Sequence, residues 1–165
     1  MLESTWKKEA DTDRLKDSDR LSQLAGFIGP LIIVIYLVLL WTGDTGFYTS
    51  EFSGLDAVVL FVPIIVGMAP SLIRLIGGRK NLSRPFDVLG TMLFVLSAVY
   101  FLCNFHFDMA YFPEPLPGSL RFLVDWLDEG WARLILLVGI FGGAIGVFWT
   151  ALTYFSVKEL LARGK

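Results

Sequence analysis

One short segment of the sequence holds the residue types that could do chemistry. It is NFHFDMAYFPEPLPG, residues 104–118, and it contains His106, the only histidine of the chain, two positions before Asp108. A histidine beside a carboxylate can bind a metal ion or relay a proton. One imidazole without nearby cysteines supplies too few ligands for zinc, and the carboxylates match no calcium-binding loop. His106 and Asp108 are therefore only weak candidates for a metal site.

A site at His106 would need carboxylates from elsewhere in the chain, and the best placed are Asp44, Glu51 and Asp56. The competing interpretation is that FHFDMAYF alternates aromatic and polar residues because its rings lie at the edge of a membrane. We favour this second interpretation, which expects His106→Ala to leave folding and any partner association nearly unchanged. Two carboxylates within about 4 Å of His106 would contradict it, because charges that close perturb each other's titration.

Four long apolar segments must position these residues. The chain has 165 residues, of which 55% are hydrophobic and only 18% charged, and its mean hydropathy is +0.62. Segments of about 20 apolar residues cross a hydrocarbon core as helices, since lipid leaves every backbone group to be paired within its own segment. We predict an all-α integral membrane protein with a four-helix bundle. The expected parts are a polar cytoplasmic segment at 1–20, a membrane domain at 21–157 with spans at about 21–41, 55–76, 85–105 and 133–157, and a cytoplasmic tail at 158–165.

The basic residues indicate the orientation of these spans. Twelve of the 14 Lys and Arg residues fall on one side of a four-span arrangement, and only Arg121 and Arg133 fall on the other. By the positive-inside rule, both termini and the loop GGRKNLSRP are cytoplasmic, as in a multi-pass protein of the plasma or inner membrane. The first outer connection, TGDTGFYTSEFSG, is rich in turn residues, and its rings at Phe47, Tyr48 and Phe52 are expected at the headgroup level.

The second outer connection is predicted to contain a short amphipathic helix at about 119–129. Its apolar residues fall at helical spacing, Ser119 can begin it, and Gly130 can end it. We expect this helix to lie flat in the outer interface with Trp126 and Trp131 as anchors. A docking surface for a partner is the alternative interpretation.

The last span carries a glycine motif, GIFGGAIG. Its glycines recur at i, i+3, i+4 and i+7, so they share one helix face: Gly139, Gly142, Gly143 and Gly146. Small residues in this pattern let a second helix approach until the backbones touch. That helix can belong to the same chain, to a second copy or to a larger subunit, and we favour a neighbour within the chain.

The sequence lacks the residue sets of several function classes. A single histidine excludes haem held between two histidines, and the single cysteine, Cys103, excludes dithiol chemistry. No Asp, Glu, His, Lys or Arg lies near the middle of an expected span, where transport sites usually have one. Prolines at 30, 63 and 70 bend the first two spans without a partner charge.

We therefore expect a non-catalytic protein without a cofactor. Its expected partners are the lipid bilayer and other membrane subunits or itself, with no nucleic acid. The predicted role is that of an accessory or structural subunit in a larger complex, such as one of respiratory or photosynthetic electron transfer, or that of a homo-oligomer. The alternative is a small ion or solute transporter, or a channel, that uses the proline-bent second helix.

Overall fold

The computed structural model describes residues 2–163, and almost all of their regular structure is helical. Four of the helices are long and apolar enough to cross a membrane, as predicted. In chain order the elements are α1 (Leu2–Asp11), α2 (Asp17–Thr42), α3 (Gly54–Gly77), α4 (Lys80–Cys103), the 3-10 helices η1 (Met109–Tyr111) and η2 (Gly118–Leu123), and α5 (Glu129–Arg163).

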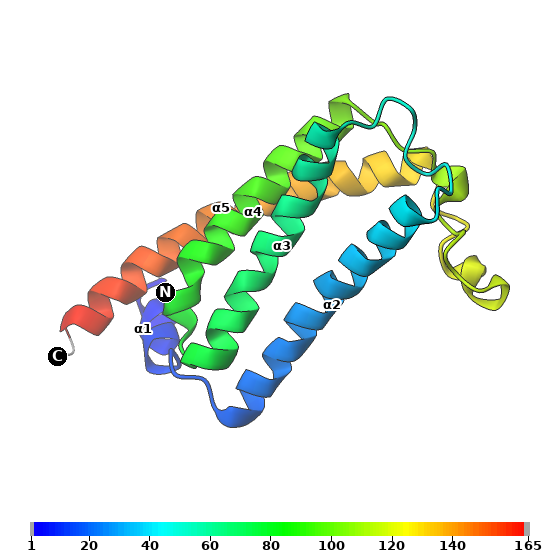
Figure 1. The fold of residues 1–165 in the computed structure, drawn as a ribbon. Coiled ribbons are helices and arrows are strands. Elements are labelled where there is room, and N and C mark those ends of the chain that lie inside the picture. Colours follow the sequence, from blue (N-terminus) through cyan, green and yellow to red (C-terminus); the bar gives the residue numbers. More distant parts are fainter. Residues whose placement is uncertain (1, 164–165) are drawn as a thin grey trace.

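The long helices pack in the order in which they occur in the chain. Helix α2 packs on α3, α3 on α4 and α4 on α5, while α1 lies against α5 (Figure 1). Among residues 2–163, α2 and α5 share no extensive contact, so the four helices form an open row instead of a closed bundle. The short turn between α3 and α4 makes these two helices antiparallel neighbours, whereas long segments join α2 to α3 and α4 to α5. Helix α1, the α3–α4 turn and the C-terminal end of α5 lie at one end of the row, which we call the inner end (Figure 1).

The helix boundaries differ from the predicted spans mainly at the inner end. The predicted loop GGRKNLSRP shrinks to a turn at Gly78 and Arg79, and Pro85 lies inside α4 instead of starting it. Gly78 ends α3 in the left-handed conformation (φ 61°), with its N–H bonded to the carbonyl of Arg74. The backbone carbonyl of Asp13 then accepts a hydrogen bond from Lys80 N–H at 2.9 Å, at the first residue of α4. The polar N-terminal segment thus pairs with the start of α4.

The prediction of one amphipathic α-helix over about 119–129 is wrong in its extent and its type. Only Gly118–Leu123 is helical there, as the six-residue 3-10 helix η2, and turns follow it. The carboxylate of Asp128 accepts a hydrogen bond from Trp131 N–H at 2.9 Å, which is the bond of a residue that caps a helix start. Gly130 therefore lies in the first turn of α5 and does not end a preceding helix. Trp126 and Trp131 pack edge to face with ring centroids 5.7 Å apart, both half exposed.

Close backbone approaches join the neighbouring helices of the row. A Cβ atom added to Gly90 of α4 would lie 3.2 Å from the Cα of Gly67 in α3. A Cβ atom added to Gly26 of α2 would lie 2.6 Å from the hydroxyl oxygen of Ser71 in α3. A side chain at Gly26 would force the Ser71 side chain to move, and one at Gly90 would require the α3 backbone to give way by a few tenths of an ångström.

The glycine face of α5 divides into two halves. A Cβ atom at Gly139 would lie 3.0 Å from the ring of Phe94, and one at Gly143 would lie 2.6 Å from a methyl group of Val95, so α4 covers this half. Gly142 and Gly146 have nothing within 4 Å of the same position. One of the two G-x-x-x-G pairs thus contacts a helix of the same chain, and the other faces open space.

Candidate functional site

The opposite end of the row, which we call the outer end, contains a buried carboxylate, Asp56, which is only 1% exposed. It lies in the first turn of α3 and forms a capping box with Ser53, because its side chain accepts a hydrogen bond from Ser53 N–H at 2.7 Å. The hydroxyl of Tyr100, near the end of α4, donates to the same carboxylate at 3.0 Å. This carboxylate therefore links the beginning of α3 to the end of α4.

His106 completes this outer cluster. Its Nδ1 lies 3.2 Å from Asp56 Oδ1, and because a carboxylate oxygen accepts, Nδ1 is the nitrogen that donates. Its Nε2 lies 3.7 Å from a carboxylate oxygen of Glu51. Two carboxylates thus lie within 4 Å, which contradicts the interpretation of His106 as an idle interfacial residue. We define the outer cluster as Glu51, Ser53, Asp56, Tyr100 and His106.

Pairing between the two outer loops brings His106 to Asp56. Asp108 N–H donates to the carbonyl of Phe47 at 2.8 Å, and Thr49 N–H donates to the carbonyl of His106 at 3.2 Å. Side chains of such extended segments alternate between two faces, so neighbouring residues point in opposite directions. Phe47 stacks on Phe107 with centroids 5.2 Å apart and is buried.

Asp108 and Asp44 do not join the cluster. The carboxylate of Asp108 accepts a hydrogen bond from Ala110 N–H at 3.0 Å and caps η1. Asp44 lies in the turn after α2 with a positive φ of 46°, and it forms no hydrogen bond or ion pair with His106 in the described chain. No group of three potential ligands within residues 2–163 could hold a metal ion. The outer cluster is thus a set of hydrogen bonds that joins α3, α4 and the outer loops.

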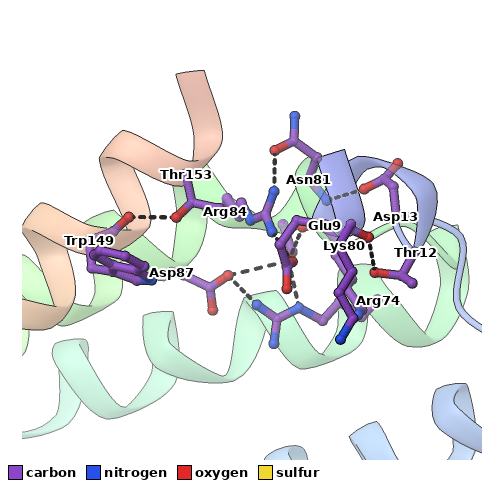
Figure 2. A network of polar contacts seen from close by, with 12 residues as sticks. Glu9, Thr12, Asp13, Arg74, Lys80, Asn81, Arg84, Asp87, Trp149 and Thr153 are labelled. Carbon is purple, nitrogen blue, oxygen red and sulfur yellow. Dashed lines mark hydrogen bonds and ion pairs between the residues drawn. The ribbon is translucent and has the colours of Figure 1, made fainter. Parts of the chain in front are cut away.

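A second polar cluster lies at the inner end (Figure 2). Arg74 of α3 forms an ion pair with Asp87 of α4 and donates from Nε to the hydroxyl of Ser83 at 2.7 Å. Ser83 is fully buried, and its hydroxyl lies 3.3 Å from the Asp87 carboxylate and 2.9 Å from the carbonyl of Lys80. These contacts join the end of α3 to the start of α4.

Arg84 extends the inner cluster to the N-terminal helix. Its guanidinium, whose side chain is only 8% exposed, pairs with the Glu9 carboxylate of α1 at 2.6 Å and donates to the Asn81 side chain at 2.8 Å. The backbone N–H of Asn81 donates in turn to the Asp13 carboxylate at 2.7 Å (Figure 2). The N-terminal segment is therefore attached to α4 by an ion pair and a buried hydrogen bond.

A polar cavity of about 350 Å³ adjoins the inner cluster. Arg74, Arg84 and Asp87 line one side of it, and Trp6 of α1 and Trp149 of α5 line the other. The indole N–H of Trp6 is buried and has no hydrogen-bond partner among the described residues. The cationic groups in this lining are already paired with Glu9 and Asp87, so the cavity carries little net charge.

Sequence reasoning missed most of these contacts, although two signals were present. The residues SGLD at 53–56 have the spacing of a capping box before an apolar run, which marks a helix start. The alternation FHFD is typical of an extended segment whose neighbouring side chains face opposite ways. Comparisons with protein-family models, with curated proteins and with solved structures found no match, so a proposal of function depends on this geometry.

We expect His106→Ala to lower the free energy of unfolding by about 1–3 kcal/mol, because it removes a hydrogen bond to a buried carboxylate. His106→Asn should restore part of this loss, since its amide nitrogen can reach the place of Nδ1. Glu51 is 77% exposed, so Glu51→Ala is the matched control and should cost less than about 1 kcal/mol. Thermal unfolding of the detergent-solubilised protein measures all three. Equal effects of His106→Ala and Glu51→Ala would contradict the structural role of His106.

We expect Asp87→Ala to destabilise the protein by about 2–4 kcal/mol, because it leaves the half-buried Arg74 without its carboxylate. The control is Asp17→Ala, since the Asp17 carboxylate is fully exposed and lies 3.7 Å from Arg20. Such a surface pair contributes less than about 1 kcal/mol. Unfolding by denaturant in mixed micelles would give both values. If Asp87→Ala lowers the free energy of unfolding no more than Asp17→Ala does, the inner cluster does not stabilise the packing of α3 on α4.

Proposed function

We propose that the chain is a non-catalytic, multi-pass membrane protein that serves as an accessory or structural subunit of a larger membrane complex, or as a homo-oligomer. One observation carries the proposal: the charged groups that are buried or half-buried at the ends of the apolar helices are engaged in contacts between elements. Asp56, Asp87 and Arg84 each bond to a partner from another element. Groups used in this way hold neighbouring helices together.

The open row of helices supports an assembled state. Residues of α5 that turn away from α4 include Phe141, Ile145 and Phe148, each about two-thirds exposed. Gly142 lies on the same helix with open space at its Cβ position, whereas Gly146 lines the polar cavity beside Trp149. A further apolar helix could approach this part of α5 closely, since small residues allow backbones to touch.

The alternative of a transporter or channel has less support. Its proline-bent helix is α3, with Pro63 and Pro70 inside it. The contact of Gly67 with Gly90 lies between the outer and the inner cluster and closes the space between α3 and α4. A path for ions or solutes between these helices would have to separate that contact.

The subunit proposal predicts that the protein leaves its native membrane together with other chains. Native mass spectrometry of gently solubilised membranes should detect the 18.5 kDa chain bound to a second copy or to other membrane proteins. Gly142 gives the sharper test, because Gly142→Leu should weaken the association while Gly54→Leu, at a glycine that is also open, should not. A lone monomer under conditions that preserve other membrane complexes would refute the proposal.

The proposed orientation has the inner end in the cytoplasm of a plasma or inner membrane, because most basic residues lie there. Single cysteines at Ser18 of α2 and at Ser50 of the first outer loop test it, since both side chains are exposed. Ser83 would be a poor site because it is fully buried. In a Cys103→Ala background, an impermeant maleimide added to intact cells should label position 50 only. Labelling of position 18 under those conditions would contradict this orientation and indicate the opposite one.

A further inference from the structure

A basic groove at the inner end adjoins the inner cluster and shares Asp13 with it. Four cationic residues from four parts of the chain line it: Lys7 of α1, Arg14 before α2, Arg79 between α3 and α4, and Lys158 of α5. Its volume is about 850 Å³, enough for a headgroup with its glycerol. Leucines 160 and 161 of α5 form an apolar part of the same lining.

Arg14 and Arg79 face each other directly in this groove. They form an isolated antiparallel bridge, flanked by hydrogen bonds from Leu15 N–H to the Gly78 carbonyl at 2.8 Å and from Lys80 N–H to the Asp13 carbonyl at 2.9 Å. Because these hydrogen bonds join the residues on either side, Arg14 and Arg79 themselves form a non-hydrogen-bonded pair. The Cβ atoms of such a pair lie about 4.5–5.5 Å apart on the same face. Like charges placed directly opposite in this way destabilise the pairing.

Neighbouring carboxylates do not offset this repulsion. Neither Arg14 nor Arg79 forms an ion pair with any of the side chains that the structure describes, at positions 4–162. Two acids line the groove, Asp11 and Asp13, against four cations. Asp13 is buried, and its carboxylate is engaged by the backbone N–H of Asn81. An anion between the two arginines would convert an unfavourable contact into a bridged pair.

We propose that this groove binds the phosphate group of an anionic membrane lipid. Arg14 and Arg79 hold the phosphate, Lys7 and Lys158 add positive charge, and the leucines of α5 contact the acyl end. Basic pockets between helices on the cytoplasmic side recognise such headgroups. The choice of a lipid over a soluble phosphate rests on the proposed membrane orientation, which puts the groove at the cytoplasmic surface.

Titration of the full chain in detergent with short-chain phosphatidylglycerol tests the proposal, with thermal unfolding as the readout. The lipid should raise the unfolding temperature of the unaltered protein, and phosphatidylcholine should raise it far less. Arg14→Gln/Arg79→Gln should weaken the apparent affinity about 30-fold, at about 1 kcal/mol for each basic residue. Without lipid, this variant should be at least as stable as the unaltered protein, because the repulsion is gone.

The matched control is Lys8→Gln/Lys16→Gln, which removes two exposed basic residues of the same segment that lie outside the groove. It should change the affinity less than about threefold, in keeping with weak contributions from distant exposed charges. An equal loss in both double variants would overturn the site in favour of a diffuse basic surface. An equal stabilisation by inorganic phosphate would overturn the lipid as its source. Neither result bears on association with other chains, so the subunit proposal is tested independently.

Discussion

The contact of Gly67 with Gly90 is the constraint on which the rest of the structure depends. Helices α3 and α4 are the middle two of the row: α2 packs on the far side of α3, and α5 packs on the far side of α4. In lipid, apolar side chains gain nothing by leaving lipid for one another, so close packing and hydrogen bonds must hold helices together. The missing side chain at Gly90 lets the two backbones approach, because a Cβ atom there would lie 3.2 Å from the Cα of Gly67. Only at that distance can residues at both ends of the pair meet.

The two polar clusters then set the register of α3 against α4. At the outer end Asp56 accepts from Tyr100, and at the inner end Arg74 pairs with Asp87. Sliding one helix by a turn, about 5.4 Å, would separate both pairs and leave buried charges without partners. Apolar contacts between the middle parts of the two helices can re-form after such a shift, whereas the paired charges at the ends cannot. The clusters therefore specify the alignment, and the glycines provide the proximity.

The parts of this fold that sequence could predict are those that depend on local composition. Apolar length predicted four long helices, and the predicted face of Gly139 and Gly143 meets α4. The error at 119–129 has a local cause as well, because Asp128 caps α5 and so competes with a helix running through it. His106 and Asp56 are 50 positions apart, and their meeting depends on pairing between two loops. No pattern within either segment encodes that pairing.

The basic residues at the inner end have two separate physical roles that counting cannot distinguish. Arg20 donates to the carbonyls of Leu75 and Ile76 and so satisfies the end of α3, while Arg74 and Arg84 pair with carboxylates. These three are fixed by their partners whatever surrounds the protein. Arg14 and Arg79 instead face each other across a bridge that the backbone alone imposes. Positive charge that the fold brings together without a paired carboxylate is balanced from outside the chain, and the anionic lipid of our proposal is one source of that balance.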